Sequence, residues 1–393
     1  MSRFWIAVYV LTAAAHLPFA ASLSILLGER LGLASLPIAL ALSAALVWLI
    51  GGRIELAKRD RPISTLRLHL IEEPYFIHWC GAVASVPLSL LLALGVALAS
   101  LAGLVASPLH ALGLAAAAAY LGGLLLSFYG VVVRRRWVRI RSIDVALPGL
   151  DPAFDGYRIV QLSDLHIGAL GPRSMAERWA LLANRAGADL IALTGDYVTS
   201  GTAFHEDIAA VLGALSAPDG VVAVMGNHDY FGDGEPLLSL LAERGVRVLR
   251  NASMRVARGG AGLCVAGVDD TYTRRADVAL ALRGAKGGDP IIALCHDPQV
   301  FPALAGGGAA LVLSGHTHAG QLALPLLWER LNLARLSYRY HAGQSRLGES
   351  LLYVHPGLGT TGPPIRIGAA PEITVFRLRA AEPPAGARGS LQR

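Results

Sequence analysis

Residues 220–229 read GVVAVMGNHD, an apolar, β-branched run that stops at Gly226 and is followed by Asn227, His228 and Asp229. Such a run is typical of a buried strand. Four other segments have the same layout, namely 157–166, 189–196, 290–297 and 309–318. Short apolar runs separated by glycine-rich or helical segments predict a layered α/β domain.

Each run ends in side chains that can bind a metal ion. In α/β sheets, ligands bind beyond the carboxyl ends of the strands, so we expect the five clusters to converge on one site. Within 164–166 and 316–318, alternate residues would share a face if the backbone stays extended. Gly195, Gly226 and Gly315 would let the chain turn tightly there. The candidate metal ligands are Asp164, His166, Asp196, Asn227, His296, His316 and His318.

The composition of this set indicates its chemistry. It contains carboxylates, imidazoles and one amide but no thiolate, which favours Mn or Fe, with Zn or Mg as alternatives. Seven ligands suit two divalent metal ions about 3.5 to 4 Å apart that share one carboxylate, an arrangement used for displacement at phosphorus. A water bridging two such ions becomes a hydroxide near neutral pH and attacks the phosphate.

The ordered series of motifs resembles the calcineurin-like metallophosphoesterase superfamily over about residues 156–379. The segments 357–362 and 371–373 are similar to its membrane-associated bacterial branch. The resemblance implies a four-layer αββα sandwich that hydrolyses phosphodiester or pyrophosphate bonds. Segment 357–362 also matches GxGxxG, but Pro363 and Pro364 follow it where a dinucleotide site needs a helix, so we expect a loop near the metal cleft.

The resemblance also implies a role for each site residue. His228 would stabilise the transition state or protonate the leaving oxygen, oriented by Asp229. Asp196 would bridge the two metals. One metal would be held by Asp164, His166, Asp196 and His318, and the other by Asn227, His296 and His316.

The first 133 residues have the composition of a membrane region. A membrane-spanning helix needs about 20 apolar residues, and residues 4–28, 31–52 and 74–133 contain no Asp, Glu, Lys or Arg. The last stretch is long enough for two crossings. We therefore expect four spans, at about 4–28, 31–52, 76–105 and 111–133. A basic juxtamembrane linker (134–155), the catalytic domain (156–379) and a disordered tail (380–393) rich in Ala, Pro and Gly would follow.

Basic residues predict the orientation of these spans, because Lys and Arg of short loops stay on the cytoplasmic side. Eleven of the twelve basic residues in 1–150 lie before the first span, between the second and third, or after the fourth, and only Arg30 lies on the other side. Both termini and the catalytic domain are therefore expected in the cytoplasm. The implied location is the bacterial inner membrane.

The charge distribution and the cysteine content argue against a nucleic-acid-binding protein and a disulfide-rich protein. The net charge is +6, but residues 1–150 hold 12 basic and 6 acidic residues, so 34 − 12 = 22 basic and 28 − 6 = 22 acidic residues remain in 151–393. A neutral catalytic domain gives no reason to expect nucleic-acid binding. Three scattered cysteines exclude a disulfide framework. The expected partners are the lipid bilayer and a phosphate-ester substrate, with a lipid-linked one favoured by the membrane anchor.

Several alternatives stay open. Residues 1–21 have features of a cleaved signal peptide. The enzyme could act on soluble phosphomonoesters or phosphoproteins, which need the same metal core. In a different class, the domain could be a non-enzymatic sensor or scaffold. A transporter would need polar residues in the spans, for which His16, His78 and His110 are the candidates.

Overall fold

The computed structural model describes residues 3–58, 61–285 and 288–380. The chain divides into two compact units. Among the described residues, the helical unit holds 3–58, 63–135 and 362–365, and the sheet unit holds 61–62, 136–361 and 366–380. The predicted disordered tail is 380–393. Residues 381–393 lie outside the described residues, and Ala380 is the last residue of a strand.

The helical unit contains the candidate membrane spans. Four helical stretches are long and apolar enough to cross a membrane: Trp5–Gly28, Gly32–Leu56, Thr65–Leu101 and Pro108–Arg136. The third differs from the expected 76–105, because the helix starts at Thr65 and ends at Leu101, before a non-helical connection. The main helices are α1 (Arg3–Ala15), α2 (Leu17–Leu31), α3 (Ser35–Lys58), α4 (Thr65–Arg67), α5 (Glu73–Leu101) and α6 (Pro108–Phe128).

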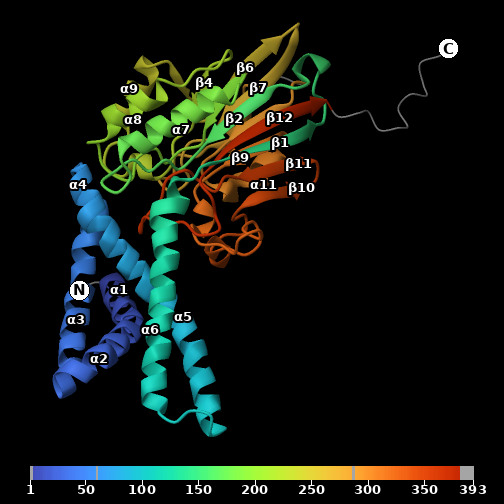
Figure 1. Cartoon of the computed structure of the whole chain (residues 1–393). Coiled ribbons are helices and arrows are strands. Elements are labelled where there is room, and N and C mark those ends of the chain that lie inside the picture. Colours follow the sequence, from blue (N-terminus) through green and yellow to red (C-terminus); the bar gives the residue numbers. More distant parts are fainter. Residues whose placement is uncertain (1–2, 59–60, 286–287, 381–393) are drawn as a thin grey trace. The chain divides into compact units, whose positions relative to one another are not determined.

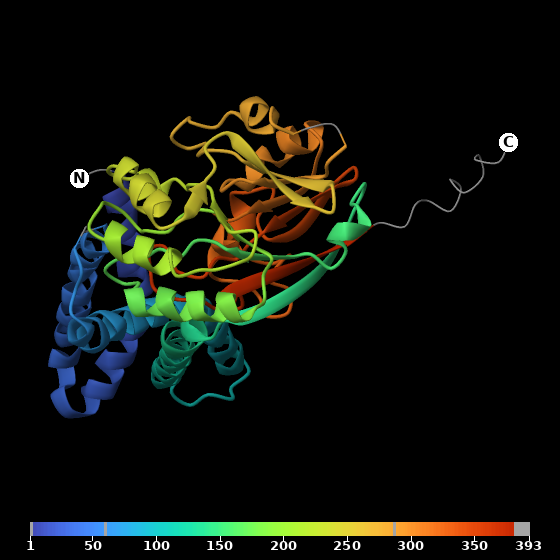
Figure 2. The ribbon, with the colours of Figure 1, turned by 90° about the horizontal axis from the view of Figure 1, so that it is seen from above.

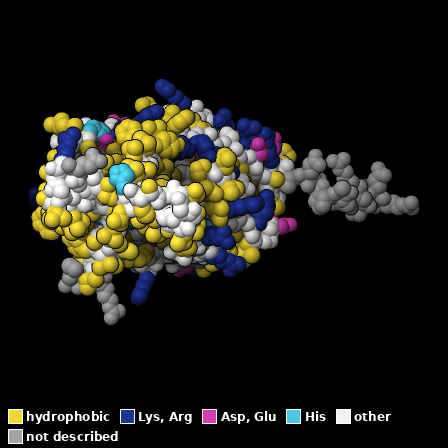
Figure 3. Space-filling model, turned by 60° about the horizontal axis from the view of Figure 1, so that its bottom comes forward, with side chains coloured by type: hydrophobic (Ala, Val, Ile, Leu, Met, Phe, Trp, Pro, Cys, Tyr) yellow, Lys and Arg dark blue, Asp and Glu magenta, His cyan; other side chains and the backbone are white. Residues whose placement is uncertain are grey.

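The surface of this unit suits lipid rather than water. Large apolar side chains are exposed along α5 and α6, including Leu90, Leu94 and Leu125. Figure 3 shows hydrophobic side chains covering much of the face that it presents. Exposed apolar area on this scale is rare in soluble proteins and is expected of membrane-spanning helices.

Polar side chains join the helices inside this unit. The Nε2 atoms of His16 and His78 lie 3.0 Å apart, and His78 Nδ1 lies 2.7 Å from the Tyr120 hydroxyl. His16 Nδ1 lies 2.8 Å from the carbonyl oxygen of Thr12 and therefore carries the proton. The cluster connects α1, α5 and α6 by hydrogen bonds, which act as interhelical contacts in an apolar environment. His110 is exposed and takes no part in it.

Twelve strands form two six-stranded sheets in the sheet unit (Figures 1 and 2). The first has the order β1-β12-β2-β3-β4-β5 and the second β10-β11-β9-β8-β7-β6. The first sheet contains β1 (Arg139–Leu147), β2 (Arg158–Leu162), β3 (Leu190–Leu193), β4 (Val221–Ala223), β5 (Val246–Val248) and β12 (Glu372–Ala380). The second contains β6 (Ala252–Arg258), β7 (Ala261–Gly267), β8 (Ile291–Leu294), β9 (Ala309–Ser314), β10 (Gly343–Leu347) and β11 (Ser350–Val354).

Three hydrophobic clusters define the layers. One lies between the sheets and joins residues of both, such as Ile159, Val222, Ile292 and Leu313. A second packs the other face of the first sheet against α7 (Arg173–Arg185), α8 (His205–Leu212) and α9 (Glu235–Glu243). The third packs the second sheet against α10 (Val278–Leu282) and α11 (Phe301–Gly306). The expected αββα sandwich is confirmed.

Part of the expected linker 134–155 is not a linker, because residues 139–147 form strand β1. This strand pairs in parallel with β12, from Arg139 opposite Glu372 to Leu147 opposite Ala380. Its apolar side chains Ile143, Val145 and Leu147 are buried and alternate with exposed residues. Arg139 Nε donates to the buried Glu372 carboxylate at 2.9 Å. The basic residues after the fourth span therefore belong partly to the sheet.

Candidate metal centre

All five expected strands are present, and each leads into a loop that carries candidate ligands. Strands β2, β3 and β4 are neighbouring and parallel in the first sheet, and β8 and β9 are neighbouring and parallel in the second. Their carboxyl ends therefore meet at one edge of the sandwich. The structure brings the side chains that follow them into contact there.

The ligand atoms form three overlapping groups, each spanning at most 4.8 Å. Nε2 of His166 lies 2.9 Å from Nε2 of His318. Asp196 Oδ2 lies 3.0 Å from His296 Nε2 and 3.5 Å from His166 Nε2. The groups are Asp164, His166 and His318; His166, Asp196 and His228; and Asp196, His296 and His316.

The backbone at these residues is strained. Ten described residues other than glycine have a positive φ, and five of them are the candidate ligands Asp164, His166, Asp196, His316 and His318. Each such residue costs about 1–2 kcal/mol and tends to occur at functional sites. The condition of an extended backbone at 164–166 and 316–318 is therefore not met. Both side chains of each pair reach the site through left-handed turns.

Glycines next to the ligands leave room for them. Gly195 has φ +91°, so the tight turn expected there is present. Gly226 and Gly315 are needed for space instead, because an added Cβ would lie 2.2 Å from Asp196 Oδ1 and 2.3 Å from Asp164 Oδ2, respectively. Larger residues at these two positions would displace the carboxylates.

The residues present fit a bound cation. Four of their polar atoms are buried without a hydrogen-bond partner, although buried polar atoms are nearly always paired. Burial lowers the pKa of His166 to about 3, so its imidazole is neutral, as a metal ligand must be. Burial alone would lower the pKa of His296, but the Asp196 carboxylate outweighs it and raises this pKa to about 10, so a cation bound beside Asp196 would replace a proton on His296. The unpaired atoms are Asp164 Oδ2, His166 Nδ1, Asn227 Oδ1 and His296 Nε2.

Neighbouring backbone groups fix the orientation of two histidines. His296 Nδ1 donates to the carbonyl oxygen of Thr194 at 2.7 Å, which leaves Nε2 facing Asp196 Oδ2 at 3.0 Å. His228 Nδ1 donates in the same way to the carbonyl oxygen of Thr199 at 2.6 Å. Carbonyl contacts of this kind set the tautomer of a functional histidine.

Asp229 does not orient His228 as expected. Its two oxygens accept hydrogen bonds from the backbone N–H groups of four residues, at 2.7 to 3.2 Å. Asp229 thereby holds together the two loops that carry Asp196 and Asn227, and the Thr199 carbonyl orients His228. The amide donors belong to Asp196, Tyr197, Val198 and Gly226.

Two further residues contact the site that the sequence did not indicate. The hydroxyl of Tyr338 lies 3.2 Å from His316 Nε2. The buried guanidinium of Arg366 places Nη2 3.2 Å from His318 Nδ1 and donates to the carbonyl of Gly359. The expected loop at 357–362 does pass the site, because Gly359 N donates to the Asp164 carbonyl at 2.7 Å. Neither Tyr338 nor Arg366 lies in a recognisable motif.

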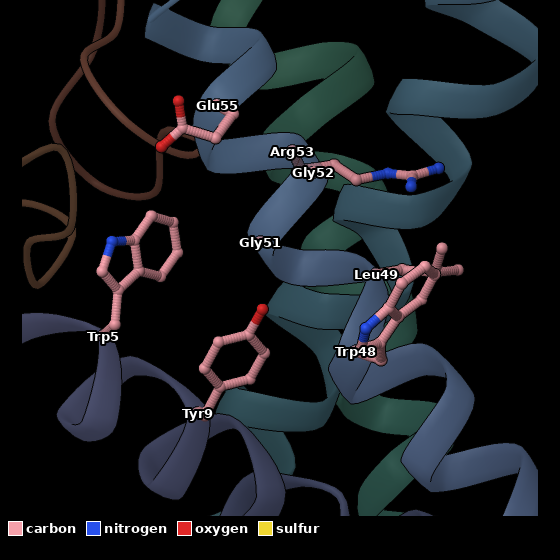
Figure 4. A pocket seen from close by; sticks show the side chains of 8 residues that line it. All are labelled: Trp5, Tyr9, Trp48, Leu49, Gly51, Gly52, Arg53 and Glu55. Atoms are coloured by element: carbon pink, nitrogen blue, oxygen red, sulfur yellow. The ribbon is translucent and has the colours of Figure 1, made fainter. Parts of the chain in front are cut away.

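A cavity of about 610 Å³ lies in the helical unit and is separate from this chemistry (Figure 4). It is lined by Trp5, Tyr9, Trp48 and Arg53, among others, and no candidate metal ligand lines it. The Tyr9 hydroxyl points toward Gly51, where an added Cβ would lie 2.3 Å away.

Comparison with known proteins agrees with this geometry. Residues 157–320 match the family model of the calcineurin-like phosphoesterases. The chain is 33% identical over 276 residues to a zebrafish (Danio rerio) "transmembrane protein with metallophosphoesterase domain", and 32% identical over 280 residues to its bovine (Bos taurus) namesake. Each alignment covers 65% of this chain and 61% of the relative, so the chain spans about three fifths of the length of these vertebrate proteins.

A bacterial relative is matched over more of its own length. The uncharacterized metallophosphoesterase YkuE of Bacillus subtilis is 33% identical over 230 residues, covering 58% of this chain and 80% of the relative. Relatives thus occur in vertebrates as well as bacteria, so the resemblance extends beyond a bacterial branch. With its two-sheet sandwich and its cluster of Asp and His at the sheet edge, the chain belongs to the calcineurin-like metallophosphoesterase family.

Proposed function

We propose that the chain is a membrane-anchored, metal-dependent hydrolase of phosphodiester or pyrophosphate bonds. One observation carries this proposal: the Nε2 atoms of two buried histidines, His166 and His318, face each other at 2.9 Å beside Asp164 and Asp196. Side chains that converge in this way around buried, unpaired atoms suit a divalent cation.

The proposed ligand sets are those that the family resemblance implies. Asp196 and His166 each lie in two of the three ligand groups, and of these only the Asp196 carboxylate has two oxygens that could serve two ions, which supports it as the shared ligand. When bound, such ions polarise the phosphoryl oxygens and lower the pKa of water. Manganese is the proposed metal. The first ion would be held by Asp164, His166, Asp196 and His318, and the second by Asn227, His296, His316 and Asp196.

We propose that His228 stabilises negative charge in the transition state or donates a proton to the leaving oxygen. Its side chain is only partly buried, whereas the candidate ligands Asp164 and His166 beside it are buried. Because Nδ1 is committed to the Thr199 carbonyl, Nε2 is the atom available to substrate. Protonated at Nε2, it would donate to the leaving oxygen. Asp229 is a positioning residue that holds the Asp196 loop through backbone amides.

Anchoring to a membrane is supported by four apolar helical stretches and by the name of the vertebrate relatives. The last candidate span ends at Arg136 and strand β1 begins at Arg139. Two residues therefore connect them, so the catalytic domain would stay within a few nanometres of the bilayer. Tethering raises the effective concentration of substrates presented there, which favours a lipid-linked phosphodiester or pyrophosphate.

A substrate panel tests the function. Purified full-length protein with Mn should hydrolyse a lipid-linked pyrophosphate in mixed micelles with a higher kcat/KM than the soluble deacylated analogue, because only the former is concentrated at the membrane surface. Nucleotides, a phosphomonoester and a phosphopeptide complete the panel. If the soluble analogue matches or exceeds the lipid, the lipid-substrate proposal fails. If the monoester or phosphopeptide is preferred, the enzyme is a phosphatase, and if nothing is hydrolysed, the proposed activity fails.

The proposed orientation places both termini and the catalytic domain in the cytoplasm. We expect a cysteine at Asp207, whose side chain on α8 is 43% exposed, to be shielded from a membrane-impermeant reagent in intact cells and labelled after lysis. The native Cys80, Cys264 and Cys295 are buried, so the unchanged chain provides the blank. A cysteine replacing Arg30, an exposed residue between the first two spans, should label from outside. The reverse pattern contradicts the orientation.

A further inference from the structure

An exposed apolar loop lies beside the metal centre. Residues 324–336, here called the leucine loop, follow β9 and the ligand His318 and precede β10 (orange in Figure 1). Six leucines in these thirteen residues are exposed, and the residues Leu326 and Leu336 are 98% and 84% exposed. They are Leu324, Leu326, Leu327, Leu331, Leu333 and Leu336.

Contacts within the loop and with the rest of the domain fix its conformation. The exposure of the leucines is therefore a property of the folded loop. Trp328 is buried against Ala319, Ala342 and Ala369 and anchors the loop to the domain. Backbone hydrogen bonds join Leu324 to Leu331 at 2.8 Å, and the Asn332 side chain donates to the Trp328 carbonyl at 2.7 Å. The fold therefore buries the tryptophan and presents the leucines to the outside.

Leu326 stands where a water-exposed loop would have glycine. Residues 324–327 form a turn closed by a hydrogen bond from Leu327 N to Leu324 O at 3.1 Å, with Pro325 at the second position. Leu326 occupies the third position with φ +68°, which glycine adopts without strain and a bulky residue does not. Leucine here is unfavourable for the turn and for contact with water, so its apolar side chain needs another reason.

The charged residues around the leucine loop indicate what kind of partner this surface binds. Arg330, Arg335 and Arg339 are exposed, while the acidic Glu329 is paired with Arg141. Leucines interspersed with arginines match the boundary between acyl chains and anionic headgroups of a bilayer. The chain itself carries four candidate membrane spans, so a bilayer is always close to the domain.

We propose that the leucine loop inserts shallowly into an anionic lipid surface. Because the loop starts just after His318 and is followed by Tyr338, which contacts His316, insertion would hold the metal centre against the headgroups. This goes beyond the proposed hydrolysis, since it assigns a second, membrane-binding surface to the sheet unit. The side chain at position 326 is its most exposed element.

The test uses full-length protein in liposomes, with an environment-sensitive fluorophore on a cysteine replacing Leu326. The matched control is a cysteine replacing Leu181, which is 59% exposed on α7. We expect the emission of the label at position 326 to shift to the blue and to be quenched by doxyl-labelled phosphatidylglycerol, and the label at position 181 to show neither effect. No turnover is measured, so the result is independent of the proposed function.

Two outcomes overturn the proposal. In the first, the label at position 326 is as accessible to water and as poorly quenched as the label at position 181. In the second, the label at position 326 is shielded in a way that depends on the protein-to-lipid ratio and not on doxyl lipid, which would assign the surface to a second copy of the chain.

The variant Leu326→Gly separates insertion from folding. Glycine relieves the turn, so Tm should be unchanged or higher, while quenching of a label on a cysteine replacing Leu336 should fall. A lower Tm, or unchanged quenching at position 336, contradicts the role of Leu326.

Discussion

Replacing Asp196 with Asn is expected to remove most of the metal from both positions and to lower kcat by at least about 10³-fold, in the upper range for a single electrostatic or acid-base group. Asparagine has nearly the same shape and can still accept the hydrogen bond from His228 N, which is 2.9 Å from Asp196 Oδ1. It lacks the negative charge that would offset two cations. Metal per chain is measured by mass spectrometry on the purified variant.

The matched control is Asp207→Asn, because Asp207 forms an exposed ion pair with Arg173 on the same unit. An exposed pair of this kind contributes little to stability. The control should keep its metal and its turnover. An Asp196→Asn protein that retains two metals per chain and full activity would rule out a shared carboxylate at this position.

The sequence predicted the position of the site because its signal is repeated locally. Each apolar run is followed at once by ligand-type residues, and parallel pairing brings the ends of neighbouring strands together. Strand β1 was missed for the opposite reason. Arg139 and Arg141 extend the basic cluster after the fourth span, and the partner strand β12 lies more than 200 residues away along the chain. Alternation of Ile143, Val145 and Leu147 was the available signal.

The detailed geometry depends on contacts that no motif encodes. The left-handed backbone at Asp164 and His166 is imposed by bonds to another loop, such as Asp164 N to Gly195 O at 2.9 Å and His166 N to Asp196 O at 3.0 Å. Tyr338, just beyond the leucine loop, contacts His316. Such contacts join segments that are distant in sequence, so neither periodicity nor spacing can indicate them.

Replacing His228 with Ala is expected to lower kcat by about 10² to 10⁴-fold, the usual range for general acid-base catalysis, while metal content stays close to that of the unchanged protein. His228 lies in one of the three ligand groups, with His166 and Asp196, so its position alone allows either role. Its ring is held by the Thr199 carbonyl at Nδ1 and is only partly buried, which favours contact with substrate over metal ligation.

The nature of the leaving group separates proton donation from transition-state charge stabilisation. If Nε2 of His228 protonates the leaving oxygen, the loss in the Ala variant should be large for an alkyl ester and much smaller for a p-nitrophenyl ester, whose leaving group departs without a proton. Equal losses for both esters would assign His228 to charge stabilisation only. His110→Ala, which removes an exposed histidine of the helical unit, controls for loss of an imidazole and should leave both rates unchanged. If metal disappears together with activity in the His228 variant, this histidine is a ligand.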